Sequence, residues 1–395
     1  MKVAFVVQRY GKEVTGGSES HCMKVAEKLS KHTDVEVITT CSLDYVTWSN
    51  YYKEGIEDIN GVIVRRFAVE KQRDIKEFNI FSENLHAKPH PKSDEIKWME
   101  LQGPYSTKLI DFIKKRSDEY DFFIFFTYLY YTTFFSLPIV KHKAILVPTV
   151  HDEPPVYLGI FKDFFKMPSA ILYNTQKEKN FVNSHFNNRN VLSDVVGVGV
   201  DLRSAEPDKF RNKYGITNVF LLYMGRIDRG KGCGELFDYF IRYKEETNST
   251  ITLVLIGRDS MEIPTHENII HLGFIPEEDK YNAISASQLV VVPSRFESLS
   301  MALLEAWSCG IPALVNGTCE VLKTHCTKSN GGLWYKNYDE FKECLELLLS
   351  DKSLRTKLGK NGKEYVKKNY SWPTIERKYL RVLDRLQKKI ISRNQ

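Results

Sequence analysis

The sequence predicts an α/β protein of two doubly wound, Rossmann-like domains, and three observations support this prediction. The chain has 395 residues, whereas single hydrophobic cores seldom grow past about 250–300 residues. Strand-like apolar runs alternate with helix-like stretches in two separate series, which is the pattern of parallel sheets covered by helices on both faces. A glycine-rich junction, residues 197–201, lies between the two series. We therefore expect one domain over residues 1–199 and a second over residues 200–371.

The first series begins with a β-branched and aromatic run at residues 3–7, which is followed by a glycine-bearing loop at residues 11–17. The apolar residues between 23 and 29 then fall on one face of a predicted helix. Further strands are expected at residues 35–39, 62–66, 122–126 and 144–147, and further helices near residues 106–115 and 130–140. This alternation predicts a parallel sheet in the first domain.

Two stretches of the first domain depart from the alternation. Residues 70–100 are polar, contain Pro89 and Pro91 and show no clear period, so we expect a loop that serves as a lid or binding element, or is disordered. Residues 122–140 carry no charge and are dense in Phe and Tyr, which gives them the hydropathy of a membrane span. Their Thr and Ser residues and Pro138 favour a buried strand followed by a helix.

The second series follows the glycine-rich junction. Its strands are expected at residues 219–224, 251–256, 269–272, 289–293 and 313–315, and its helices near residues 234–243, 277–286, 301–309 and 339–349. An amphipathic helix over residues 372–395, with Pro373 in its first turn, ends the chain. The second domain is therefore another doubly wound unit of similar size.

Composition excludes several classes of protein. The 56 Lys and Arg residues exceed the 50 Asp and Glu residues by only six, without a basic tail, so nucleic-acid binding is not required. The seven cysteines are widely spread and include no C-x-x-C pair, which argues against a disulfide framework or a zinc site and for a reducing compartment. Residues 1–7 lack the length and the cleavage site of a signal peptide. We expect a cytoplasmic protein, with contact at the inner face of the membrane as an open alternative.

The loop after the first strand has the Gly-x4-Gly spacing of a phosphate loop between Gly11 and Gly16. Gly17, however, stands where a P-loop needs its lysine, and the G-x-G-x-x-G fingerprint is absent as well. What remains is the pair Gly16-Gly17 at the start of a helix, where backbone can approach a ligand closely. A plain turn from loop to helix explains the pair equally well.

A second glycine-rich loop follows the first strand of the second domain. Arg226 and Lys231 lie in a segment with three glycines in ten residues, 223–232. The planar fork of an arginine and the point charge of a lysine could together hold a diphosphate. Two solvated surface cations are the alternative, and the glycine density argues against it.

The most specific segment is residues 294–312. Ser298 or Ser300 could cap a helix that Gly310 and Pro312 end. Glu297 would lie in the loop before this helix, and Glu305 would lie inside it among residues that look buried, so its carboxylate needs a partner. The backbone N–H groups of Leu299, Ser300 and Met301 could then meet the phosphates of a ligand.

These motifs resemble those of the retaining GT-B glycosyltransferases of family four. The resemblance rests on motifs that occur in the expected order along nearly the whole chain: Gly16-Gly17, Val150-His151-Asp152, Gly199-Val200-Asp201, Gly225-Arg226-Ile227-Asp228 with Lys231-Gly232, and Glu297-x7-Glu305 running into Gly310-Ile311-Pro312. Two positions depart from the family pattern. Leu299-Ser300 stands where the family often has Phe-Gly, which would add a side chain beside the phosphates, and Val198 stands where it often has Asn.

The resemblance implies a GT-B architecture, in which two facing Rossmann-like domains border a cleft. The domain over residues 1–199 would be the acceptor side, completed by the last helix, and the domain over residues 200–371 would bind a nucleotide-sugar donor. The implied catalytic residues are Glu297, His151, Arg226 and Lys231. The implied donor-binding residues are Gly16, Gly17, Arg226, Lys231, Gly273, Phe274, Ile275, Glu297, Leu299, Ser300, Met301 and Glu305.

The resemblance also implies a role for each residue. Arg226 and Lys231 would hold the donor diphosphate, Glu305 the ribose hydroxyls and Glu297 the hydroxyls of the transferred sugar. The backbone of residues 273–275 would face the base. His151 would lie beside the sugar, and Gly16-Gly17 would border the donor phosphate and the acceptor.

The expected activity is that of a retaining hexosyltransferase. It would move a hexose from a nucleotide diphosphate sugar, with a UDP-sugar favoured, to a hydroxyl of a glycan or lipid-linked glycan in surface polysaccharide biosynthesis. No cofactor and no metal is expected, because cations and a helix N-terminus can stabilise the leaving diphosphate and the sequence has no Asp-x-Asp motif. His86 and His90 are separated by Pro89, which favours a surface loop over a ligand pair.

The expected acceptor region comprises residues 70–100 and the aromatic residues 122–135, with peripheral contact to a membrane. Two other functions remain open. A sugar-nucleotide epimerase of the same architecture would release a changed sugar nucleotide without an acceptor. A non-catalytic glycan-binding or scaffold protein would tolerate the loss of Glu297 or Lys231.

Overall fold

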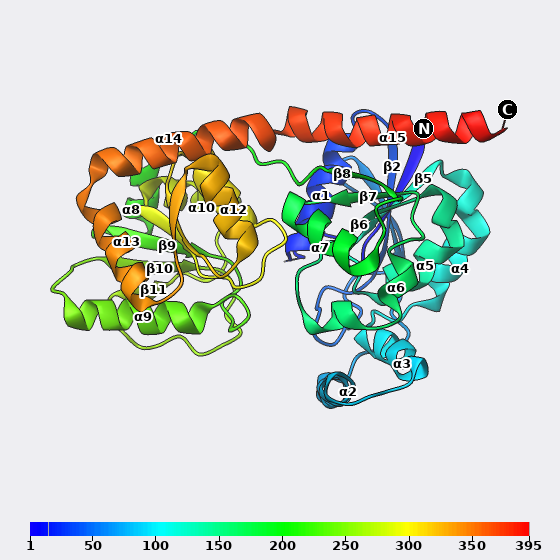
Figure 1. The fold of residues 1–395 in the computed structure, drawn as a ribbon, viewed down its shortest axis with the longest axis horizontal. Coiled ribbons are helices and arrows are strands. Elements are labelled where there is room, and N and C mark those ends of the chain that lie inside the picture. Colours follow the sequence, from blue (N-terminus) through cyan, green and yellow to red (C-terminus); the bar gives the residue numbers. More distant parts are fainter. Residues whose placement is uncertain (15, 395) are drawn as a thin grey trace. The chain divides into compact units, whose positions relative to one another are not determined.

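The computed structural model describes residues 1–14 and 16–394. Thr15, inside the predicted glycine-bearing loop, and Gln395, at the end of the predicted last helix, lie outside the described residues. The chain divides into two compact units: unit 1 comprises Met1–Val198 with Ile375–Gln395, and unit 2 comprises Gly199–Thr374. Each unit contains one sheet with helices packed on it (Figure 1), so the α/β fold class of two doubly wound domains is confirmed.

The sheet of unit 1 has eight described strands. They are β1 (Lys2–Val6), β2 (Asp34–Thr40), β3 (Gly55–Ile59), β4 (Val62–Phe67), β5 (Phe122–Phe126), β6 (Ala144–Val147), β7 (Ala170–Tyr173) and β8 (Leu192–Val195). Their order is β3-β4-β2-β1-β5-β6-β7-β8. All neighbours are parallel except β3 and β4, which pair antiparallel across the turn Asn60-Gly61, where both residues have positive φ. An Asn-Gly turn between two strands is a strong hairpin signal, and the prediction of a purely parallel sheet was wrong at this edge.

The helices of unit 1 cover its sheet and form one extension. They are α1 (Gly17–Leu29), α2 (Ile75–Ala87), α3 (Lys92–Gln102), α4 (Thr107–Arg116), α5 (Tyr131–Ser136), α6 (Phe161–Phe164), α7 (Gln176–Phe186) and most of α15 (Trp372–Asn394). Residues 122–140 form β5, α5 and the beginning of a 3-10 helix over Leu137–Lys143, so the predicted strand and helix are confirmed. Among the described residues, no helix is long and apolar enough to cross a membrane.

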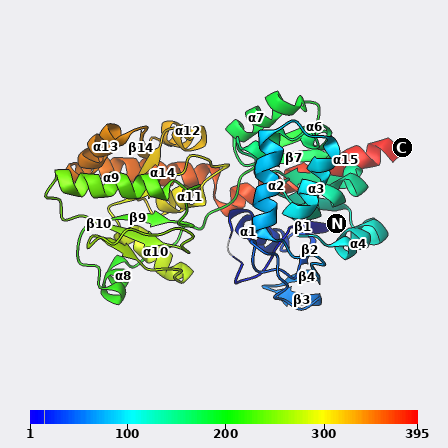
Figure 2. The ribbon, with the colours of Figure 1, turned by 90° about the horizontal axis from the view of Figure 1, so that it is seen from below.

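The prediction of an irregular loop at residues 70–100 was wrong, because this stretch forms α2 and α3 side by side (Figures 1 and 2). The Asp74 carboxylate caps α2 by accepting the backbone N–H groups of Lys76 and Glu77. Of the residues in α2, only Leu85 is fully buried, although apolar residues recur every three or four positions from Ile75 to Leu85. The two prolines lie in the short connection between the helices, where they interrupt neither.

Unit 2 has a fully parallel sheet among its described strands. They are β9 (Phe220–Met224), β10 (Thr252–Ile256), β11 (Ile269–His271), β12 (Leu289–Val292), β13 (Ala313–Asn316) and β14 (Gly332–Tyr335), and their order is β11-β10-β9-β12-β13-β14. Numbered within the unit, this order is 3-2-1-4-5-6, the Rossmann order. The direction of winding therefore reverses between β9 and β12, which pair directly.

Seven helices of unit 2 are described: α8 (Pro207–Tyr214), α9 (Cys233–Glu246), α10 (Glu277–Ala286), α11 (Met301–Ser308), α12 (Glu320–Ser329), α13 (Tyr338–Ser350) and α14 (Lys352–Asn369). Helices α9 and α13 pack their aromatic and leucine side chains on one face of the sheet. Helix α14 packs closely against α11 and the residue after it: a Cβ at Gly362 would collide with the Trp307 side chain of α11, and a Cβ at Gly359 with the carbonyl of Gly310. This contact fixes the end of α11, whose start borders the candidate site.

Candidate functional site

The carboxyl ends of β9 and β12 define the candidate site in unit 2. In doubly wound sheets, ligands bind outside the carboxyl ends of the strands at the point where the winding reverses. Residues 225–232 follow β9 and residues 293–300 follow β12, so the reversal brings these two loops together. Five of the predicted site residues, Arg226, Lys231, Glu297, Leu299 and Ser300, lie in these loops.

Glycines let the loop after β9 lie close to its neighbours. Gly232 has φ +76°, and a Cβ there would collide with the carbonyl oxygen of Pro293 at the end of β12. A Cβ at Gly257, after β10, would collide with the carbonyl oxygen of Gly225. Backbone packing at the strand ends therefore requires some of these glycines. The glycine density alone is not evidence of a ligand, contrary to the expectation from sequence.

The two loops are joined by an ion pair. The Lys231 Nζ lies 2.7 Å from the Glu297 Oε1, with the lysine side chain 32% and the glutamate side chain 13% exposed. The Arg226 Nε lies 2.5 Å from the Asp228 Oδ2, and the other oxygen of Asp228 accepts the backbone N–H of Lys231 at 2.8 Å. The predicted diphosphate-binding cations are thus both close to carboxylates.

Two further ion pairs occupy the same edge of the sheet. The Glu305 carboxylate, 5% exposed in α11, lies 2.8 Å from the Lys280 Nζ of α10. This lysine is the partner that the buried setting of Glu305 requires, and the sequence pattern did not identify it. Arg295, after β12, lies 2.6 Å from Glu235 of α9. Arg226, Lys231, Lys280 and Arg295 thus each have a carboxylate partner at this edge.

The start of α11 differs from the prediction. Ser300 occupies the N-cap position with φ +73° and makes no side-chain cap hydrogen bond, so the expected serine cap was wrong at Ser300. A positive φ favours glycine, which is the residue that the resembled family often has there. Leu299 and Ser300 are 5% and 6% exposed, and Met301 opens the helix. Leu299 and Ser300 are therefore both buried, and the expectation that this departure adds a side chain beside the phosphates stays a prediction.

Residues 273–275 lie next to the end of β10. The Gly273 carbonyl accepts the backbone N–H of Gly257 at 2.8 Å. Phe274 is 75% exposed, whereas Ile275 is buried. The segment thus exposes the Phe274 ring to solvent, while the hydrogen-bonded Gly273 and the buried Ile275 hold the backbone on either side of it.

Gly16 and Gly17 lie in unit 1, at the N-terminus of α1. Helix α1 starts at Gly17, and Gly16 is its N-cap. Glu19 lies in the first turn, pairs with the buried Arg9 at 2.9 Å, and leaves no room for a Cβ at Gly16. A carboxylate in the first turn offsets the attraction of a helix N-terminus for anions, and Arg9 in turn offsets this carboxylate.

His151 also lies in unit 1, after β6, on a segment that a buried carboxylate holds. The His151 Nδ1 lies 3.3 Å from the Glu153 Oε1. The Glu178 oxygens accept the backbone N–H groups of Val150 and Asn174, both at 2.6 Å. Burial raises the pKa of Glu178 to about 8, and burial also raises the pKa of Glu153.

The sequence analysis missed Glu178, although a signal was present. Thr175 caps α7 by accepting the backbone N–H of Glu178, and Thr-x-x-Glu is the spacing of a capping box. Such a box places a glutamate at the start of a helix, next to the end of the preceding strand. It could have identified Glu178 as a residue whose carboxyl group accepts hydrogen bonds from backbone N–H groups.

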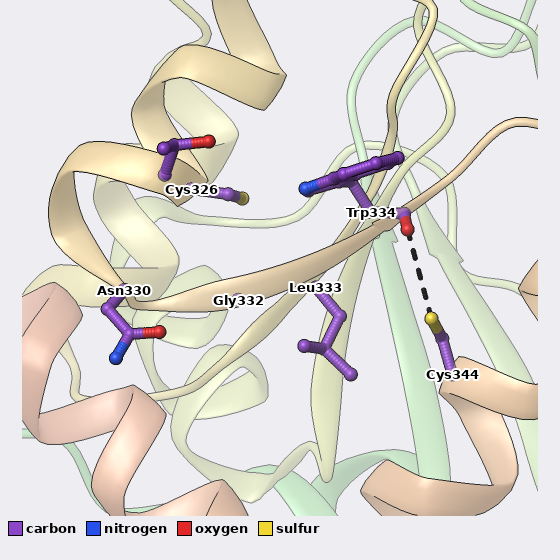
Figure 3. Close-up of a pocket in the computed structure, with 7 residues that line it drawn as sticks. Cys326, Asn330, Gly332, Leu333, Trp334 and Cys344 are labelled. Carbon is purple, nitrogen blue, oxygen red and sulfur yellow. Dashed lines mark hydrogen bonds between the residues drawn. The ribbon is translucent and has the colours of Figure 1, made fainter.

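One pocket of about 390 Å³ lies away from these residues, between α12, β14 and α13 (Figure 3). Its lining consists of Cys326, Thr327, Asn330, Gly332, Leu333, Trp334 and Cys344, and none of these carries a charge. Figure 3 shows the Trp334 carbonyl and the Cys344 thiol in a hydrogen bond of 3.8 Å. In residues 1–14 and 16–394, no three His, Cys, Asp or Glu side chains gather as a metal site would require.

Comparison with known proteins agrees with this geometry. Residues 206–365, which contain both loops of the candidate site, match the family model of glycosyl transferases group 1. An uncharacterized glycosyltransferase of Methanocaldococcus jannaschii is 24% identical, with 97% of each chain covered.

Solved structures share the fold of the whole chain. Sucrose-phosphate synthase from Thermosynechococcus elongatus superposes with a TM-score of 0.73 at 14% identity, covering 98% of this chain and 99% of that one. Anabaena HepE, solved in complex with UDP-glucose, gives a TM-score of 0.69 at 15% identity, covering 97% and 99%. The fold is therefore GT-B, and together with the family match it supports a glycosyltransferase.

Proposed function

We propose that this chain is a retaining hexosyltransferase that transfers a hexose from a nucleotide diphosphate sugar, a UDP-sugar first among them, to a hydroxyl of a glycan or lipid-linked glycan. The observation that carries the proposal is the convergence of Arg226, Lys231, Glu297 and Glu305 at the winding reversal of unit 2. The solved complex of HepE with UDP-glucose supports the choice of donor, because that protein shares the fold.

The proposed chemistry follows from the charges of these side chains. Breaking the bond between the sugar and the diphosphate places negative charge on the leaving group. Cations already positioned at the strand ends stabilise that charge in the transition state without a metal. In this proposal Arg226 and Lys231 hold the diphosphate, while Glu305 accepts hydrogen bonds from the ribose and Glu297 from the transferred sugar.

The acceptor belongs to unit 1 in this proposal. His151 is placed after β6 by Glu178, and a rigidly held imidazole could contact the sugar. Helices α2 and α3 add an extension that exposes Ile80 by 62%. We propose that this extension contacts a lipid-linked acceptor during surface polysaccharide biosynthesis. Vesicles containing anionic lipid should bind the chain at low salt, and failure to bind would remove the membrane contact from the proposal.

Thermal unfolding with UDP, GDP, ADP, dTDP and NAD in parallel tests the donor class. A ligand that binds only the native state stabilises it by about 2.7 kcal/mol at a hundredfold excess over its dissociation constant. The proposal expects a shift with one nucleoside diphosphate and none with NAD. If none of the diphosphates shifts the transition, the proposed donor site is wrong.

A further inference from the structure

Four ion pairs lie at the carboxyl edge of unit 2, where the diphosphate of the proposed donor would bind. Arg226, Lys231, Lys280 and Arg295 each lie within 2.5–2.8 Å of a carboxylate. A diphosphate that approaches this edge therefore meets cations whose charge is already offset. At Lys231 a phosphate and the Glu297 carboxylate would compete for one ammonium group, because two anions held by the same cation repel each other.

The four pairs differ in how firmly their carboxylates are held. Glu305 is buried within α11, and Asp228 also accepts the backbone N–H of Lys231. Glu235 accepts a hydrogen bond from the Asn316 side chain at 3.2 Å as well as pairing with Arg295. Glu297, by contrast, lies in the irregular segment between β12 and α11, and Lys231 is the one partner described for its carboxylate, whose side chain is 13% exposed. The pair Lys231–Glu297 is the one most readily exchanged.

We propose that Glu297 is an exchangeable counter-ion of Lys231: it holds the lysine while the site is empty, and the diphosphate of the donor displaces it. The displaced carboxylate is then available to accept hydrogen bonds from the hydroxyls of the sugar. A single exchange thus makes Lys231 available to the diphosphate and Glu297 available to the sugar. This inference rests on the proposed function, and it adds to it that Glu297 opposes binding of the bare diphosphate.

The exchange predicts an unusual effect of a substitution. Replacing Glu297 by an uncharged residue removes the competitor for Lys231, so the affinity for UDP should rise even though transfer is lost. A glutamate that only contacts the sugar would leave the affinity for UDP unchanged. We expect Glu297→Gln and Glu297→Ala to lower the Kd of UDP about fivefold, the range of a partly exposed ion pair.

Titration calorimetry of the full chain with UDP, GDP, ADP and dTDP, and with inorganic pyrophosphate, tests the proposal. The tightest-binding diphosphate is then titrated into the two Glu297 variants. Glu246→Gln is the matched control, because it changes the net charge equally at the end of α9, which lies at the opposite edge of the sheet. In a Lys231→Met background the effect of Glu297→Gln should disappear.

Three results are informative. Tighter binding by the Glu297 variants alone supports the exchange. If these variants fold, as thermal unfolding shows, and bind the diphosphate as weakly as the wild type or more weakly, the exchange is wrong and the proposed donor site stands. If the wild-type chain binds neither pyrophosphate nor any nucleoside diphosphate, the exchange and the proposed function are both wrong.

Discussion

The two units place charged groups at the carboxyl edges of their sheets in contrasting ways. In unit 1 the Glu178 carboxylate is buried and accepts two backbone N–H groups, and Glu19 pairs with the buried Arg9. In unit 2 the pair Lys231–Glu297 joins two side chains that are both partly exposed. Buried carboxyl groups that accept backbone N–H groups fix loops, whereas partly exposed ion pairs can exchange partners at small cost. The comparison suggests that unit 1 contributes rigid loops and unit 2 contributes the groups that respond to a ligand.

Among the substitutions that test this contrast, Glu178→Ala should cause the largest loss of stability. The substitution leaves the N–H groups of Val150 and Asn174 without their acceptor, and a buried donor without a partner costs about 1–3 kcal/mol. We expect unit 1 to lose about 2–5 kcal/mol of unfolding free energy, measured by hydrogen exchange of its strands. Glu297→Gln, the comparison variant, should change unit 2 by less than about 1 kcal/mol. Equal losses would remove the contrast.

Lys231→Met should have the next largest effect, and on activity rather than stability. Removing one preorganised charge that stabilises a leaving group lowers kcat by about 10²–10³. We expect such a loss in transfer from the nucleotide sugar, with thermal unfolding nearly unchanged. Lys342→Met, which removes a cation paired with Glu246 elsewhere in unit 2, is the control and should retain activity. A fully active Lys231→Met chain would contradict the proposed role of this loop.

Glycine substitutions separate structural from ligand roles. Gly232→Ala forces a Cβ against the Pro293 carbonyl at positive φ, so we expect about 1–3 kcal/mol of destabilisation. A Cβ at Gly17 would meet no atom within 4 Å, and this glycine lies in α1, so Gly17→Ala should be neutral or slightly stabilising. Thermal unfolding of both variants gives the comparison. A stable Gly17→Ala chain with reduced activity would indicate that a ligand approaches this backbone.

The smallest predicted effect is a pH dependence in unit 1. The pKa of Glu178 is raised by burial from 4.5 to about 8, so between these values the folded chain binds more protons than the unfolded chain. Its contribution to stability therefore falls as the pH rises through that window, by up to about 1.4 kcal/mol per pH unit. Thermal unfolding between pH 6.5 and 8 should show this slope in the wild type and a weaker one in Glu178→Gln. An identical slope in both would contradict the assignment.

Most of the strands and helices proposed from local sequence patterns are present in the structure, because apolar runs and helical periodicity reflect burial directly. Residues 70–100 were misjudged because the prolines and polar residues outweighed the helical spacing of the apolar residues in α2, and because α3 has almost no apolar periodicity. The hairpin at Asn60-Gly61 carried a clear turn signal that was overlooked. Besides α2 and α3, the elements that were not predicted at all are strands β3, β7, β8 and β14 and helices α6, α7, α8, α12 and α14.

The candidate site was predicted less completely than the fold. Motifs pointed to Arg226, Lys231, Glu297 and Glu305, which the structure places at one edge of one sheet. The ion pair between Lys231 and Glu297 could not be predicted, because it joins residues 66 apart in sequence through the strand order. Lys280 was missed for the same reason: its partner is 25 residues away on another helix.

The central claim is that the carboxyl edge of unit 2 transfers a sugar from a nucleotide diphosphate. Proton NMR of the chain with the sugar conjugate of the diphosphate that stabilises it, in the presence of a glycan acceptor, tests this claim most directly, with Lys231→Met measured beside the wild type. We expect the wild type to release the nucleoside diphosphate and to form a new glycosidic anomeric signal, while the variant does so at least about tenfold more slowly. A changed sugar nucleotide without release of the diphosphate, or equal rates in the two chains, would contradict it.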